Sequence, residues 1–197
     1  MRIPYSRIAL VGMMGVGKTT VGRRLAELLG WSFIDTDALV EERAGQKISE
    51  IFQTRGEEAF RELERAAVIS ALKEEDAVIA LGGGAVAYRD NISLLKQRAL
   101  VVWLRAEVAD LVRRLHRDQT RPLLQGVDPA VRLGELLERR KDYYAQAHVH
   151  IDTTQRGLEE ICSEIIDYLM GLSGGRELDA GTGDGGPRGT ELRHSDW

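Results

Sequence analysis

Residues 12–19 have the sequence GMMGVGKT, followed by Thr20, and this stretch decides the fold of the chain. It fits the pattern G-x-x-x-x-G-K-[ST], in which backbone N–H groups surround a polyphosphate. The three glycines let the loop curl tightly because they carry no Cβ. Lys18 can reach the β- and γ-phosphates, the Thr19 hydroxyl can hold Mg²⁺, and the next helix points its positive end at the anion. The stretch therefore predicts one nucleotide-phosphate site.

The flanking residues supply the context that such a loop needs. Residues 7–11 read as a short buried strand, and Val21, Leu25 and Leu28 recur at helical spacing after the loop. Strand, glycine loop and helix in this order distinguish a phosphate loop from an accidental glycine-rich turn.

Further apolar runs alternate with helical periodicity along the chain. This alternation predicts an α/β fold, a five-stranded parallel sheet with helices on both faces. The expected strands are residues 8–11, 33–34, 77–81, 100–104 and 149–151.

Length and composition limit the domain count and the partners. The 197 residues, 43% of them hydrophobic, suit one domain, which we expect over residues 1–170. Residues 171–197 contain eight glycines without apolar periodicity, which predicts a disordered tail. The net charge of −4 argues against nucleic acid or an anionic membrane as a partner. No apolar run reaches the roughly 18–20 residues of a membrane span, and we expect a cytoplasmic protein. We also expect a monomer.

Unusual residues follow four of the five expected strands, where α/β sheets bind their ligands. They are the phosphate loop, the residues 35–37, the glycines 82–84 and the residues 152–156. Asp35 and Asp37 point to opposite sides of the local backbone and are expected to differ in role. One can orient the Mg²⁺ shell opposite Thr19, and the other can face an acceptor hydroxyl. Alternatively, Asp37 caps a helix beginning at Ala38.

The glycine triplet and the arginines are ambiguous from the pattern alone. Glycines 82–84 suit either a tight turn or the close approach of a small polar substrate. Arg61 and Arg139 are each typical of a surface ion pair. Residues 115–127 mix basic residues with Pro122 and Gly126, which is typical of a mobile flap over transferring phosphates. A helix is expected to begin after Asp128 as its N-cap.

With these residues placed, the sequence resembles the shikimate kinases, small relatives of the nucleoside monophosphate kinases, over roughly residues 5–170. The resemblance rests on VGMMGVGKTT at 11–20, FIDTD at 33–37, GEEAFRELE at 56–64, GGGA at 82–85, RPLL at 121–124, and Glu138-Arg139 with Tyr143.

The resemblance implies the P-loop kinase fold and the MgATP-dependent phosphorylation of the shikimate 3-hydroxyl, a step toward chorismate and the aromatic amino acids. It implies a substrate-binding region at about 35–65 and a mobile lid at about 114–127. Lys18, Asp37 and Arg121 are the implied catalytic residues. The implied ATP contacts are Gly15, Val16, Gly17, Lys18, Thr19, Thr20, Arg114, Arg121 and Arg156. The implied shikimate contacts are Asp37, Arg61, Gly83 and Arg139, and the implied Mg²⁺ positions are Thr19 and Asp35.

Two alternatives compete with this assignment. A kinase of another polyol acid, such as gluconate, would use the same fold, but the joint presence of Arg61, the glycine triplet and Arg139 argues against it. A nucleotide-dependent switch is a different class of protein, and the chain contains no Asn/Thr-Lys-x-Asp motif for reading guanine.

Overall fold

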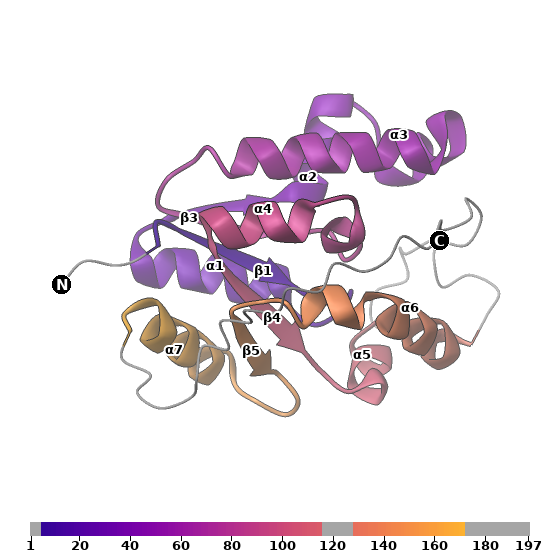
Figure 1. Ribbon diagram of the computed structural model, residues 1–197. Coiled ribbons are helices and arrows are strands. Elements are labelled where there is room, and N and C mark those ends of the chain that lie inside the picture. The colour runs from indigo at the N-terminus through magenta and orange to yellow at the C-terminus, as the bar shows by residue number, and fades with distance from the viewer. Residues whose placement is uncertain (1–4, 116–127, 172–197) are drawn as a thin grey trace, which may run out of the picture.

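The computed structural model describes residues 5–115 and 128–171, in which strands and helices alternate (Figure 1). The expected lid residues 116–127, including Arg121, and the tail residues 172–197 lie outside the described residues. The strands are β1 (Arg7–Val11), β2 (Ser32–Asp35), β3 (Ala77–Ala80), β4 (Leu100–Arg105) and β5 (Val149–Asp152). The helices are α1 (Lys18–Leu29), α2 (Thr36–Ala44), α3 (Ile48–Ala71), the 3-10 turn η1 (Ala85–Ala87), α4 (Asn91–Arg98), α5 (Val108–Leu115), α6 (Pro129–Tyr144) and α7 (Leu158–Leu169).

The five strands form one parallel sheet in the order β2-β3-β1-β4-β5, which confirms the predicted sheet. β1 lies in the centre, where Leu10 pairs with Ala80 of β3 and with Val102 of β4. Its apolar side chains point to the two faces of the sheet and are fully buried because helices cover both faces. The loop that follows β1 therefore leaves from the middle of the sheet's carboxyl edge.

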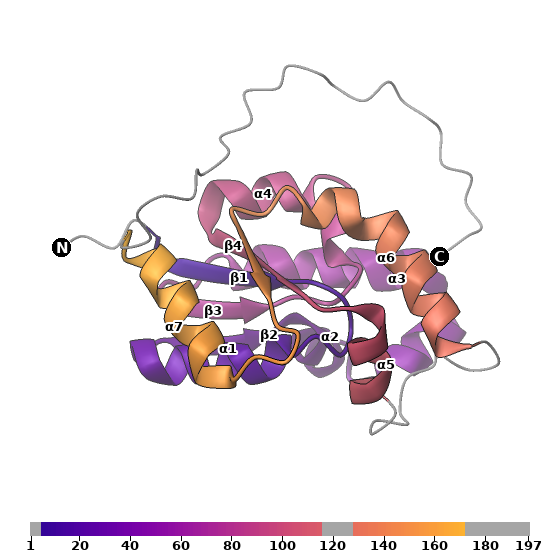
Figure 2. The ribbon, with the colours of Figure 1, turned by 90° about the horizontal axis from the view of Figure 1, so that it is seen from below.

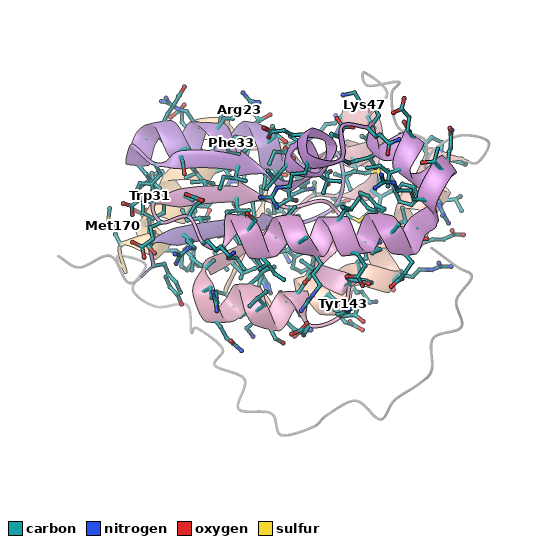
Figure 3. The ribbon with its side chains drawn as sticks, turned by 90° about the horizontal axis from the view of Figure 1, so that it is seen from above. Arg23, Trp31, Phe33, Lys47, Tyr143 and Met170 are labelled. Atoms are coloured by element: carbon teal, nitrogen blue, oxygen red, sulfur yellow. The ribbon has the colours of Figure 1, made fainter. Side chains whose placement is uncertain are left out.

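Helices cover both faces of the sheet. α1 and α7 lie together on one face, and α3, α4 and α6 lie on the other (Figure 2). Viewed from above, the strands lie between α1 and α3 (Figure 3). On the α1 face, the Arg23 guanidinium lies 5.3 Å from the centroid of the Phe33 ring. Among the described helices, none combines the length and the apolar character needed to cross a bilayer.

Two apolar clusters hold these layers together. The larger one joins the sheet to the helices on both faces, and it contains the fully buried Cys162 of α7. A second, smaller cluster is formed within the α2–α3 pair. It consists of Val40, Ile51, Phe60 and Ala67.

The N-caps of α2 and α6 decide two expectations about helix starts. Asp35, not Asp37, caps α2: its Oδ1 accepts from the N–H of Asp37 at 3.0 Å and from that of Ala38 at 3.4 Å. The helix begins at Thr36, two residues earlier than the pattern predicts, so Asp37 falls in its first turn and its side chain does not serve as the cap. Asp128 caps α6 as expected, with a 2.8 Å bond from the N–H of Ala130.

Candidate active site

The phosphate loop leaves β1 and leads directly into α1, whose N-cap is Gly17. Gly12 has φ +138°, and a Cβ there would overlap the carbonyl oxygen of Leu104 on β4. Only glycine fits this position, because the backbone of the loop passes directly against the neighbouring strand. The first-turn N–H groups of α1 lack carbonyl partners within the helix, so they are placed to bind an anion.

Lys18 is the first residue of α1, and its side chain turns back over the loop. Its Nζ donates to the carbonyl oxygens of Gly12 at 2.8 Å and Met13 at 3.0 Å. These bonds keep the ammonium at the loop rather than in open solvent. A bound polyphosphate would find the positive charge already beside it.

Thr19 and Asp35 meet at the carboxyl edge of the sheet. The Thr19 hydroxyl donates to Asp35 Oδ2 at 3.0 Å, while the other carboxylate oxygen caps α2. The pair offers one hydroxyl and one carboxylate oxygen beside the loop. Mg²⁺ is usually held in this way, by one or two protein oxygens together with water and substrate phosphates. Within residues 5–115 and 128–171 no group of three or more His, Cys, Asp or Glu forms a separate metal site.

The glycine triplet after β3 lies against two carboxylates. A Cβ on Gly82 would be 2.5 Å from Asp37 Oδ1 and 2.5 Å from Glu64 Oε1, so both side chains lie on the same side of its Cα. The Gly82 N–H donates to the buried Thr36 hydroxyl at 3.0 Å, which ties the triplet to the start of α2. The triplet is therefore a site of close side-chain approach and not only a turn.

Arg61 reaches the same place from α3. Its guanidinium lies at Gly84, where a Cβ would be 2.7 Å from Nη1. It forms ion pairs with Glu64 at 2.8 Å and with Glu57 at 3.2 Å, and its side chain is 13% exposed. The ion pair expected from the pattern exists, but it lies inside the site and not on the surface. Burial raises the pKa of the Glu64 carboxyl, and the neighbouring Asp37 charge adds to this effect against the attraction of Arg61 and Arg140.

The helix α6 adds Arg140 and Tyr144 to this cluster. The Arg140 residue is 4% exposed, its Nη1 would lie 3.5 Å from a Cβ on Gly83, and its buried Nε has no hydrogen-bond partner among the described residues. Tyr144 is fully buried and donates from its hydroxyl to the Gly83 carbonyl at 2.5 Å. Arg139, which the sequence match selects, lies on the exposed face of the helix. The structure thus brings Arg140 to the glycine triplet.

Arg114 and Arg156 take different positions relative to the phosphate loop. Arg114 donates to the Val16 carbonyl at 3.1 Å and to the Thr153 carbonyl at 2.9 Å, so it joins the phosphate loop to the loop after β5. Arg156 pairs with Glu160 and Glu164 of α7, both at 2.7 Å. Arg114 is therefore at the phosphate loop, whereas the guanidinium of Arg156 is held by α7.

Three residues of this cluster were not singled out from the sequence: Glu64, Arg140 and Tyr144. Glu64 stands three positions after Arg61, a spacing that places both on one face of a helix, so it was the most accessible of the three. Only the phase of the helix shows that Arg140 and Tyr144, and not their neighbours Arg139 and Tyr143, face the interior. The apolar residues Leu133 and Leu136 give that phase, because they are buried on the same face as Arg140 and Tyr144.

Known proteins resemble this chain in sequence and in fold. The family model described as shikimate kinase matches residues 14–170. A shikimate kinase of Moorella thermoacetica is 48% identical over 162 residues, which are 82% of this chain and 93% of that protein. A shikimate kinase from Acinetobacter baumannii, solved in complex with shikimate, superposes with a TM-score of 0.81 at 39% identity and covers 87% of this chain and 96% of its own.

A gluconokinase from Sinorhizobium meliloti also superposes, with a TM-score of 0.58 at 22% identity over 87% of this chain and 95% of its own. This likeness shows a shared fold alone. The family model and the high identity over nearly the whole described structure go further: the chain belongs to the shikimate kinase family.

Proposed function

We propose that this chain transfers the γ-phosphoryl group of ATP to the 3-hydroxyl of shikimate, giving shikimate 3-phosphate and ADP. The observation that carries the proposal is the cluster at the glycine triplet, where Asp37, Arg61 and Glu64 lie together close to the phosphate loop. A substrate with a reacting hydroxyl and a carboxylate on a small ring needs two kinds of partner. A protein carboxylate accepts the hydrogen bond of its hydroxyl, and cationic donors bind its carboxylate.

On the nucleotide side, the loop and Lys18 act by positioning and by charge. In-line phosphoryl transfer needs alignment and neutralisation more than covalent chemistry. The loop N–H groups would bind the β- and γ-phosphates, and Lys18 would stabilise the negative charge that develops on the transferred group. Thr19 and Asp35 would hold Mg²⁺, which would neutralise the negative charge of the phosphates when bound. The family pattern adds three proposed nucleotide contacts: Arg114, Arg156 and Arg121, the last of which belongs to the expected lid.

On the acceptor side, Asp37 would accept the hydrogen bond of the reacting hydroxyl and hold its oxygen in line with the γ-phosphorus. The new bond joins that oxygen to phosphorus, the bond from phosphorus to the bridging oxygen of ADP breaks, and the hydroxyl proton passes to Asp37 or to solvent. Arg61 and an arginine of α6 would bind the acceptor carboxylate through paired N–H donors. The family pattern assigns that second role to Arg139, whereas the contact of Arg140 with Gly83 favours Arg140.

The proposal is tested by ATP-dependent ADP release with shikimate, with gluconate or with no acceptor, each with and without Mg²⁺. Turnover that requires both shikimate and Mg²⁺ is the expected result. Turnover without an acceptor, or with gluconate alone, would leave the phosphate loop intact and contradict the acceptor site.

Two properties complete the proposal. We place the enzyme in the cytoplasm, where ATP is available, and we expect a monomer because one chain supplies every group named above. Light scattering during gel filtration tests the second point, and a dimer mass at micromolar concentration would contradict it.

A further inference from the structure

Tyr144 connects the acceptor side to the phosphate loop and has no role in the proposal above. Its hydroxyl donates to the Gly83 carbonyl at 2.5 Å and lies 3.8 Å from the sulfur of Met13 in the phosphate loop. The residue is fully buried, so water does not compete for this hydrogen bond. Burial raises the pKa of the hydroxyl to about 12, and it therefore remains a donor at neutral pH.

The bond to Gly83 fixes the orientation of a whole peptide unit. The described peptide bonds are all trans, so the N–H of Gly84 points opposite to the Gly83 carbonyl and thus away from Tyr144. Within the described chain, no backbone carbonyl accepts a hydrogen bond from the N–H of Gly83 or Gly84. This peptide is the central one of a turn that the Ala85 N–H closes onto the Gly82 carbonyl at 3.1 Å. Glycine allows such a central peptide to flip while the bond of the turn is kept, so the hydrogen bond from Tyr144 favours one of its two orientations.

The ring of Tyr144 is held as firmly as its hydroxyl. Trp103 of β4 stacks on it with centroids 5.7 Å apart and planes 23° apart, and His150 of β5 packs edge-on against Trp103 at 5.1 Å. Two neighbouring strands thus fix the side chain from the side of the sheet. A rigid donor opposite a flexible glycine peptide is an arrangement that orients the peptide.

We propose that Tyr144 is a positioning residue of the acceptor site, whose hydroxyl sets the Gly83–Gly84 peptide so that this backbone meets the bound acceptor in one orientation. The inference rests on the proposed function, because it takes the glycine triplet to be an acceptor contact. It makes a distinct statement, since loss of the hydroxyl should weaken acceptor binding while leaving the nucleotide site unchanged.

The test compares Tyr144→Phe with Tyr143→Phe, its neighbour on α6, which is only partly buried. The KM for shikimate, the KM for ATP, kcat and the melting temperature are measured for each. For Tyr144→Phe we expect the shikimate KM to rise about tenfold, because the Gly83 carbonyl loses a buried partner. The ATP KM should stay within about twofold. Tyr143→Phe should match the wild type in all four quantities.

A merely structural role would lower the melting temperature and kcat without separating the two KM values, and that result would overturn the inference. An unchanged shikimate KM, or an equal rise of both KM values, would overturn it as well. Failure of the proposed function is recognised separately, because the wild type and Tyr143→Phe would then not turn over shikimate either.

A second variant covers the case in which Tyr144→Phe does not fold. Trp103→Phe keeps the tyrosine hydroxyl and reduces only the stacking area that fixes its ring. We expect a smaller rise in the shikimate KM, about twofold to fivefold, again without a change in the ATP KM. No difference from the wild type in a folded Trp103→Phe protein would count against the role of the rigid ring.

Discussion

The Thr19 hydroxyl donates a hydrogen bond to Asp35 Oδ2 over 3.0 Å, so the first turn of α1 is joined directly to the end of β2. The same Asp35 uses Oδ1 to cap α2. One carboxylate therefore has two separable duties: its charge faces the phosphate loop, and its geometry starts the next helix.

The substitution Asp35→Asn separates these duties. Asparagine is as good an N-cap as aspartate, so α2 should keep its start and the melting temperature should change little. The lost charge should raise the Mg²⁺ concentration needed for half-maximal activity by about tenfold and lower kcat at limiting metal. Titration of activity with Mg²⁺ measures this, and Asp128→Asn, which changes the cap of α6, is the matched control. A Mg²⁺ requirement equal to that of the wild type would contradict the metal role of Asp35.

The substitution Lys18→Ala should lower kcat by about 10²–10³-fold or more, because a preorganised charge at the transferred group is removed. ATP binding should weaken less, since the loop N–H groups and the end of α1 remain. Steady-state kinetics and equilibrium binding of ATP distinguish these effects, with the exposed Lys73→Ala as control. Near wild-type turnover in Lys18→Ala would contradict the assignment of the loop.

The two adjacent arginines of α6 can be told apart by parallel lysine variants. Lysine keeps the charge but not the planar pair of donors that a carboxylate prefers. Because Arg140 contacts Gly83 and Arg139 lies on the exposed face, we expect Arg140→Lys to raise the shikimate KM by about tenfold or more. Arg139→Lys should change it by less than about threefold. The reverse order of the two effects would support the assignment implied by the family pattern.

A methyl group on Gly82 should damage activity more than stability. Its Cβ would stand 2.5 Å from both the Asp37 and Glu64 carboxylate oxygens, and these side-chain ends can move aside at a modest cost in folding free energy. Their displacement misplaces the groups that meet the acceptor, so kcat/KM for shikimate should fall by about tenfold to a hundredfold. Gly134→Ala on α6, where a Cβ meets open space, is the control and should stabilise the protein by about 0.4–1 kcal/mol. Equal activity of the two variants would argue against close approach at the triplet.

His148 predicts a stability change in mild acid. Its Nδ1 accepts a 3.0 Å hydrogen bond from the Val101 N–H, which only the neutral ring can do. Burial, aided by Lys96, lowers the pKa of His148 below the ordinary value of 6.5. Above pH 6.5 the ring is neutral in both states; as the pH falls below 6.5, the unfolded chain binds the proton first and stability decreases. Denaturant unfolding between pH 7.5 and pH 5.5 should therefore show a steeper loss for the wild type than for His148→Gln, and parallel curves would contradict this.

The strand ends of this fold were predictable because the apolar runs stop at residue types, such as aspartate and glycine, that are unfavourable in a buried strand. Asp35, Asp37 and the glycine triplet stood out for that reason. The capping role was not predictable in the same way, since Asp35 and Asp37 both precede the apolar residues 38–40 and only the observed start at Thr36 separates them.

Helix phase explains the remaining differences between expectation and structure. Adjacent residues on a helix are rotated by about 100°, so Arg139 and Arg140 face different surroundings although a motif match can select either. Glu64 is different: its spacing from Arg61 predicts an ion pair, but such pairs are common on charged helices, and only burial reveals that this pair lies in the site.

The separate apolar cluster within the α2–α3 pair has an evolutionary consequence. This pair carries Asp37, Arg61 and Glu64, yet its own contacts hold much of it together apart from the core that supports the phosphate loop. Substitutions that reshape the pair can therefore accumulate without destabilising the sheet. A lineage can keep one way of handling ATP while its acceptor preference drifts, which is how a single ancestral scaffold can give rise to kinases of different small molecules.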